Sequence, residues 1–180
     1  TQTQTILMNN SIDVVIPYNE TDRHLVVEAL TSILIQVDCN PIIHMVADNC
    51  KPYYLTTPEP INSIPTPILP TSQEIVDGTT IIHYVTPGIG PYHIVNKLVP
   101  SFQTNYIAIQ DADDISYPIR LSHQLRILQD YVMTSGAMKQ LAIEGYNGTR
   151  HIHEPVLYSG EKLVAAPMGR FVNSVRAMRK

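Results

Sequence analysis

The chain has 180 residues, of which 44% are hydrophobic and 16% charged, and its formal net charge is −4. This length fits one domain with a sizeable core, and the composition is typical of a globular protein rather than a disordered one. Twelve Lys+Arg against sixteen Asp+Glu give no general basic surface, so we expect no nucleic-acid partner. No apolar run approaches the roughly 20 residues of a membrane span.

The cysteines and the first residues bear on the compartment. Cys39 and Cys50 stand outside any CxxC or Cys/His zinc spacing, and a disulfide between them is allowed but not required. The first ten residues carry no basic segment and no long apolar core, so no signal peptide is evident. We therefore expect two reduced thiols in a cytoplasmic protein.

The first part of the chain predicts a strand, a helix and a second strand. Residues 11–18 are a β-branched run that indicates a buried strand, and the apolar positions of 21–36 lie on one helical face. Residues 41–48 predict another buried strand. The stretch 50–70 holds six prolines, which exclude a helix or a central strand, so we expect a long surface excursion there.

The alternation continues after the prolines and changes character near residue 135. Glycine turns, proline positions and hydrophobic periodicity set the expected boundaries. In order, we expect a strand (79–86), a glycine turn and short helix (87–102), a strand (105–110), a helix (118–133), a strand–turn–strand unit (137–153) and a last strand (169–180).

This order predicts an α/β fold with a doubly wound, mostly parallel sheet flanked by helices and a mixed β portion at the C-terminal end. In such sheets ligands bind beyond the carboxyl ends of the strands. The polar residues of interest stand at those ends: Asn19 and Glu20 after the first strand, Asp48 after the second, and Asp111 and Asp113 after the fourth.

Three carboxylates occur within four positions in Asp111-Ala112-Asp113-Asp114. Like charges this close raise one another's pKa unless a cation lies between them. One interpretation is a solvated turn at a helix start, where acidic residues are favourable. The other is a divalent-cation site, because carboxylate oxygens suit Mg²⁺ and Mn²⁺. The position between a strand and a helix favours the metal interpretation.

Two weaker patterns carry less weight. His151 and His153 alternate onto one strand face, but they lack a third ligand in range and are interpreted as surface residues. The glycine turn at 87–90 is not a GxGxxG motif and lacks the lysine of a P-loop, so it predicts no such phosphate site.

Taken together, these residues resemble family-two glycosyltransferases of the GT-A fold. "VVIPYNETDRHLVVEALTSILIQ" (14–36) is similar to the family's opening V-V-I-P-x-Y-N strand and S-I-L-x-Q helix end, one residue shorter after the proline. "VADN" is similar to the D-D or D-N that ends the second strand, and "GIGPYHIVNKL" keeps the glycine and asparagine of G-x-x-x-A-x-N. "DADDISYPIRL" (111–121) reproduces the hallmark D-A-D-D-I-x-x-P-x-R-L. "NSVRAMRK" resembles a final M-x-R-K strand.

The resemblance covers residues 11–135 well and the remainder loosely. It implies one GT-A domain over 1–180, with 11–135 binding a nucleotide-sugar and 136–180 beginning the acceptor side. Asp48 would read the base edge, Asp111 and Asp113 would hold Mn²⁺ or Mg²⁺ on the diphosphate, and Asp114 and Arg120 would support the loop. The implied nucleotide-sugar-binding residues are Pro17, Tyr18, Asn19, Glu20, Asp48, Asn96, Asp111, Ala112 and Asp113.

The function so implied is metal-dependent transfer of a sugar, with inversion, from a UDP-sugar to a glycan, lipid or protein acceptor, with peripheral membrane association allowed. One departure concerns the general base, which the family carries in an E-D segment beyond the M-R-K strand. Glu144, Glu154 and Glu161 do not match that segment. We therefore expect a truncated chain, a base from another chain, or a domain that binds donor without normal transfer.

Other functions stay open at this level. A non-catalytic nucleotide-sugar-binding module would share the same donor site. A sugar nucleotidyltransferase would need a glycine-rich, basic phosphate loop after the first strand, which "PYNETDR" (17–23) lacks. A phospho-acceptor receiver domain also uses strand-end aspartates, but it would need a lysine after a later strand.

Overall fold

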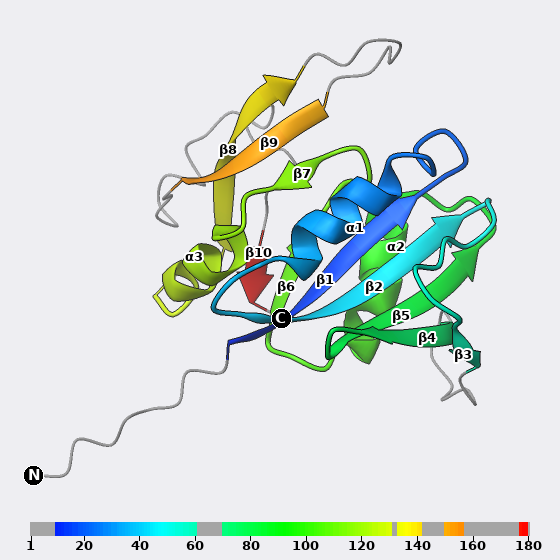
Figure 1. Ribbon diagram of the computed structural model, residues 1–180. Helices are drawn as coiled ribbons and strands as arrows, with labels where there is room; N and C mark the ends of the chain where they lie inside the picture. Colours follow the sequence, from blue (N-terminus) through cyan, green and yellow to red (C-terminus); the bar gives the residue numbers. More distant parts are fainter. Residues whose placement is uncertain (1–9, 61–69, 131–132, 142–149, 157–176, 180) are drawn as a thin grey trace, which may run out of the picture.

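The computed structural model describes residues 10–60, 70–130, 133–141, 150–156 and 177–179, and the side chains of those up to residue 130. The chain forms an α/β fold in which helices flank a mixed sheet (Figure 1). This confirms the expected α/β class with a mixed sheet, whereas the GT-A type stays a prediction.

Four parallel strands form the centre of the sheet. They are β1 (Ser11–Tyr18), β2 (Asn40–Asp48), β5 (Thr79–Thr86) and β6 (Tyr106–Ile109). β1 pairs with β2 on one side and β6 on the other, and β2 pairs with β5. The central order is therefore β5-β2-β1-β6. Helices cover both faces, which explains why these strands read as nearly continuous apolar runs.

The helices divide between the two faces of the sheet. α1 (Val26–Leu34) and α3 (Arg120–Ile127) share a core with one face of β1 and β2, built from residues such as Ile16, Leu30 and Leu121. α2 (Pro91–Leu98) and the 3₁₀ turn Val99–Ser101 cover the opposite face. Figure 1 shows α1 and α2 on opposite sides of the strands.

The first helix is shorter than the expected 21–36. The Asn19 Oδ1 atom accepts hydrogen bonds from the backbone N–H groups of Thr21 (2.8 Å) and Asp22 (3.3 Å). This side chain stabilises a turn over residues 20–25 in place of the first helical turn, because short amide side chains compete with helical hydrogen bonding. The expected helix 118–133 is likewise shorter, since α3 occupies Arg120–Ile127.

The connections create a reversal in strand order. From β1 the chain passes through α1 to β2, and β5 follows on the same side. From β5 it passes through α2 and returns to β6, on the other side of β1. The strand order therefore reverses at β1, whose neighbours β2 and β6 are reached through helices on opposite faces of the sheet, and ligands in such sheets bind beyond the carboxyl ends at this point.

An antiparallel unit extends the sheet beyond β5. β4 (Pro70–Val76) pairs with β5, and β3 (Glu59–Pro60) pairs with β4. Asp77 and Gly78 join β4 to β5 with φ of 49° and 81°, as a two-residue hairpin with both central φ positive requires. Neither β3 nor β4 is among the strands expected from the sequence, and residues 61–69 lie outside the described part.

The other edge of the sheet holds the C-terminal strands. β10 (Ala177–Arg179) is antiparallel to β6 and to β8 (Met133–Leu141), and β8 is antiparallel to β9 (Arg150–Val156). β7 (Ile115–Ser116) pairs with β9 in parallel. The expected strand–turn–strand unit and final strand are confirmed in these parts, and the turn at 142–149 lies outside the described residues.

Two further expectations concern the cysteines and membrane-spanning helices. Cys39 and Cys50 are both free thiols, and burial raises the pKa of Cys39 to about 11. None of the described helices combines the length and apolar character needed to cross a membrane.

Candidate functional site

A pocket of about 150 Å³ lies beyond the carboxyl ends of β1, β2 and β6. It occupies the place where the strand order reverses, the usual ligand position in an open α/β sheet. The lining residues are Pro17, Tyr18, Asn19, Asp22, Asp48, Pro91, Asp111, Ala112 and Asp113.

The acidic loop after β6 separates its three carboxylates. The Gln110 side-chain amide donates hydrogen bonds of 3.0 Å to the carbonyl oxygens of both Asp111 and Asp114, which ties the two ends of the loop together. Asp114 is 2% exposed and does not line the pocket, whereas Asp111 and Asp113 are half-buried and line it. Only two of the three carboxylates therefore meet at the pocket.

Arg120 lies beneath this loop and is 1% exposed. Its guanidinium donates hydrogen bonds to Gln110 Oε1 (2.7 Å), Ser116 Oγ (2.8 Å) and the Ile109 carbonyl oxygen (2.9 Å). Burial lowers the pKa of Arg120 to about 10, although the negative charges of Asp111 and Asp114 oppose that shift. A buried cation thus offsets repulsion among the carboxylates from inside the fold.

The end of β1 supplies one wall of the pocket. Tyr18 is 3% exposed, and its hydroxyl oxygen accepts a hydrogen bond of 2.8 Å from the backbone N–H of Tyr53. Burial raises the pKa of Tyr18 to about 12, so the phenol stays protonated at neutral pH. Asn19 lines the pocket and stabilises the following turn, whereas Glu20 is exposed and does not line it.

Asp22 is a lining residue that the sequence did not single out. Burial raises the pKa of its carboxyl, and the nearby negative charge of Asp113 raises it further. The expected helix over 21–36 gave no reason to place this residue at the strand ends. Its position depends on the turn that Asn19 stabilises, which is the only local signal that could have revealed it.

Asp48 lines the same pocket, but its oxygens are engaged within the chain. Its carboxylate accepts hydrogen bonds from the Thr86 hydroxyl and from the backbone N–H groups of Gly88 (2.9 Å), Ile89 (2.9 Å) and Gly90 (2.8 Å). Burial alone would raise the pKa of Asp48, but these hydrogen bonds outweigh it and lower the pKa. The carboxylate is therefore ionised and holds the turn before α2.

The remaining expected binding residues separate into two groups. Ala112 lies between the two pocket carboxylates and lines the pocket. Asn96 is exposed on α2 and is not among the lining residues. Pro17, Tyr18, Asn19, Asp48, Asp111, Ala112 and Asp113 thus come together, while Glu20 and Asn96 do not. The side chains of Glu144, Glu154 and Glu161 lie outside the described part.

The pocket carboxylates fit a hard divalent cation only if other ligands complete the site. No group of three or more His, Cys, Asp or Glu within the described ranges is arranged to hold a metal ion by itself. Mg²⁺ usually takes one or two carboxylates and fills its remaining positions with water and substrate phosphates. Asp111 and Asp113 match that donor set.

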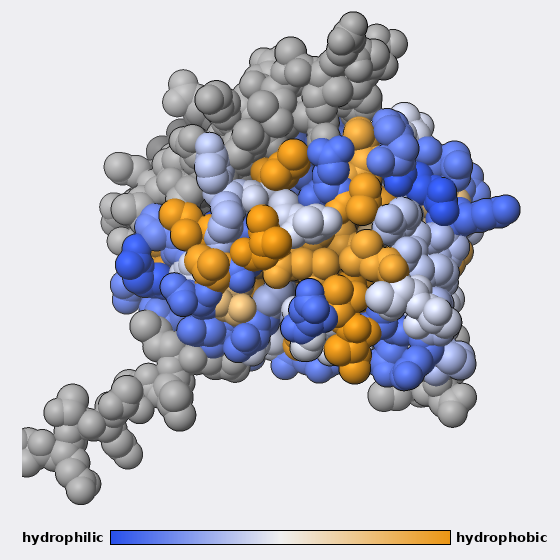
Figure 2. Space-filling view, in the orientation of Figure 1, coloured by the Kyte–Doolittle hydropathy of each residue, from blue (hydrophilic) through white to orange (hydrophobic). Residues whose placement is uncertain are grey.

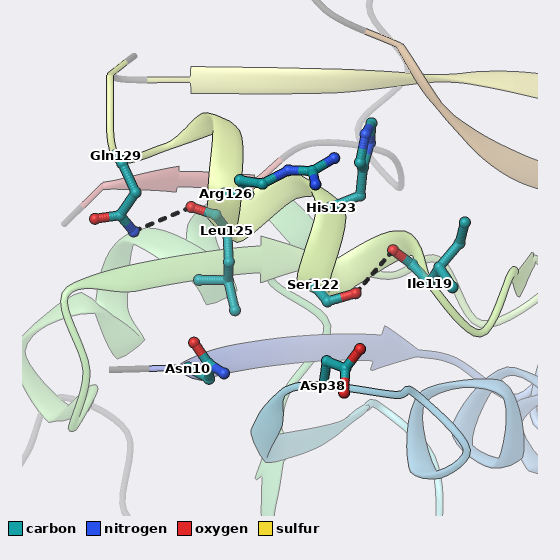
Figure 3. Close-up of a pocket in the computed structure, with 8 residues that line it drawn as sticks. All are labelled: Asn10, Asp38, Ile119, Ser122, His123, Leu125, Arg126 and Gln129. Atoms are coloured by element: carbon teal, nitrogen blue, oxygen red, sulfur yellow. Dashed lines mark hydrogen bonds between the residues drawn. The ribbon is translucent and has the colours of Figure 1, made fainter. Parts of the chain in front are cut away.

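A larger cavity of about 370 Å³ lies beside α3, near the amino end of β1 (Figure 3). Asn10 and Asp38 form one side, and Ser122 and Leu125 of α3 face them. Figure 2 shows apolar patches on the face of the molecule in view, and Ile119, which lines the cavity, is 53% exposed. None of the expected site residues lines this cavity, so it is distinct from the pocket at the strand ends.

No family model matches the chain, and no curated protein matches its sequence.

Proposed function

We propose that this chain is a glycosyltransferase that takes its sugar from a UDP-sugar and transfers it with inversion. The observation that carries the proposal is the meeting of Tyr18, Asn19, Asp111 and Asp113 in one pocket at the reversal of strand order. These residues come from the ends of two strands that are more than ninety positions apart in the sequence. Their polar and acidic character at the usual ligand position of such a sheet supports a ligand site there.

The donor's diphosphate would lie against Asp111 and Asp113. A pocket of about 150 Å³ is smaller than the roughly 300 Å³ at which small-molecule sites begin, so only part of a nucleotide-sugar would lie inside it. The rest would extend over the rim. Four carboxylates line the pocket, at Asp22, Asp48, Asp111 and Asp113, and they would repel a bare diphosphate.

A divalent cation resolves that repulsion. Asp111 and Asp113 would hold Mn²⁺ or Mg²⁺ together with phosphate oxygens, since these metals prefer oxygen ligands. When bound, the metal supplies positive charge that stabilises the departing diphosphate.

The residues of the chain have separate tasks in this proposal. Arg120 and Gln110 hold the acidic loop in place, so the two pocket carboxylates need no rearrangement to meet a ligand. The buried Tyr18 forms a rigid wall beside the ligand. In the transfer itself, the acceptor hydroxyl oxygen attacks the anomeric carbon as the bond to the diphosphate breaks, and a general base takes the hydroxyl proton.

The test is calorimetric titration with UDP, in Mn²⁺ and in chelator, of the wild type and of Asp113→Ala. We expect binding that requires the metal and is lost in the variant. Asp130→Ala is a matched control, because Asp130 is exposed beyond α3 and outside the pocket, and it should bind UDP as the wild type does. A folded wild type that does not bind UDP with Mn²⁺ would refute the proposal.

Catalysis needs its own measurement. Release of free sugar from UDP-glucose and related UDP-sugars in Mn²⁺ would support an enzyme, because water can replace a missing acceptor. Metal-dependent UDP binding without any release of sugar from the tested donors would instead favour a binding module.

A further inference from the structure

We infer that Asp48 acts on the donor site as a positioning residue, through the turn at 87–90, and does not read the base. This inference rests on the proposed function, since it concerns how the same pocket recognises its nucleotide. Its consequence is that the identity of the base is not selected by this carboxylate.

The acceptor capacity of Asp48 is nearly used up. A carboxylate offers about four acceptor positions on its two oxygens. Oδ1 already accepts from the Thr86 hydroxyl and from the N–H groups of Gly88 and Ile89, and Oδ2 accepts from the N–H of Gly90 at 2.8 Å. A base edge would have to use the one position left on Oδ2 or displace a bond that the turn needs.

The turn depends on this carboxylate for two reasons. Gly88 and Gly90 have φ of 89° and 81°, and three successive N–H groups converge on the Asp48 side chain. Converging backbone donors of this kind need an anion to accept from them. The same carboxylate places negative charge at the first turn of α2, where the helix dipole favours it.

The turn also packs against Asn49, the residue directly after β2. The backbone N–H of Asn49 donates to the Thr86 carbonyl oxygen at 2.8 Å, and a Cβ at Gly88 would lie 3.4 Å from the Asn49 Cβ. Pro91, directly after the turn, lines the pocket. Loss of the Asp48 bonds would therefore displace a pocket wall, whichever base the ligand carries.

The first arm of the test needs no ligand. We expect the amides of residues 88–90 to exchange at least about tenfold faster in Asp48→Asn than in the wild type, because an amide cannot accept at both of its atoms. Thr86→Val should show a smaller change in the same amides, and Thr86→Ser should restore protection. Thr71→Val is the control, since it removes a hydroxyl bond to the His83 carbonyl oxygen on the far edge of the sheet.

The second arm compares nucleotides. In Mn²⁺, we expect Asp48→Asn to weaken UDP and ADP binding by the same factor, about tenfold, so that the ratio of the two Kd values stays unchanged. Thr86→Val should weaken both ligands together, and Thr86→Ser should not.

Two results would overturn the inference. Unchanged exchange at 88–90 in Asp48→Asn would show that the turn does not need the carboxylate. A UDP-to-ADP ratio that moves more than about fivefold would show that Asp48 reads the base. A wild type that binds neither nucleotide would refute the proposed function, and the exchange arm would still decide whether Asp48 holds the turn.

Discussion

Replacing Arg120 by methionine should destabilise the fold severely, because it removes a buried cation and leaves its partners unsatisfied. Arg120 is 1% exposed and donates to Gln110, Ser116, Gln124 and the Ile109 carbonyl oxygen. Gln110 Oε1 keeps a second donor in the Ser116 hydroxyl, at 2.6 Å. The other acceptors lose the guanidinium, and the buried Asp114 loses a nearby positive charge.

The magnitude follows from these losses. An unsatisfied buried acceptor costs about 1–3 kcal/mol of unfolding free energy, and three acceptors lose the guanidinium here, so we expect a loss of about 4 kcal/mol. With a urea dependence of about 2 kcal/mol per molar, the unfolding midpoint should fall by about 2 M. The unfolding midpoint of Arg120→Lys should lie between those of the wild type and Arg120→Met, because lysine keeps the charge but loses the planar fork of donors. Equilibrium urea unfolding followed by circular dichroism measures all three proteins.

The matched control is Arg126→Met, on the same helix but exposed. Its midpoint should change by no more than the effect of about 0.5 kcal/mol typical of surface substitutions. If Arg120→Met shifts the midpoint no further than Arg126→Met does, the hydrogen bonds of Arg120 do not stabilise the acidic loop.

Three further changes test other parts of the fold. Burial alone would raise the pKa of Asp13, but hydrogen bonding and attraction to His44 (2.7 Å) outweigh it and lower the pKa. The stabilising contribution of Asp13 is therefore present at neutral pH and is lost as the pH falls through that depressed pKa. Asp13→Asn should therefore lose less stability between pH 6 and pH 3 than the wild type does in thermal melts, and an equal loss in both would contradict this sign. Glu74→Gln replaces the carboxylate that accepts hydrogen bonds from the Thr56 N–H and hydroxyl, so limited proteolysis should cut near residues 51–56 faster. Glu59→Gln is the exposed control. Gly78→Ala should lower the unfolding free energy by about 1 kcal/mol because of the positive φ of 81° alone, since a Cβ there would meet no atom within 4 Å. An unchanged urea midpoint would count against this geometry of the turn.

The sequence predicts the central strands well because their signal is local. Residues 11–18 and 79–86 become β1 and β5 with the expected boundaries, since buried parallel strands are continuous β-branched runs. The hairpin between β4 and β5 was missed, although Asp77-Gly78 is a strong turn signal. The prolines before it favour an irregular excursion, although β4 itself begins at Pro70.

The candidate site was predictable in position but not in detail. Strand-end polar residues converge because parallel strands share one edge, so the meeting of Asn19, Asp111 and Asp113 follows from topology. Asp22 and Asp48 show the limit of that reasoning. Whether a carboxylate faces a ligand or its own backbone depends on a turn conformation that sequence patterns do not specify.

The segment that follows the acidic loop is bonded to α1 and to the residues directly after this helix. The Ser116 N–H donates to Oγ of Ser32 in α1 (3.0 Å). The side chain of Gln36, just after α1, accepts from the Leu121 N–H (2.8 Å) and donates to the Tyr117 carbonyl oxygen (2.7 Å). Ordering a loose loop on binding would subtract conformational entropy from the affinity. Gln110 ties the loop together, and the segment after it is fixed to α1 and its C-terminal turn. A ligand entering the pocket would therefore meet a preorganised surface, and little of its binding free energy would be spent on ordering the chain.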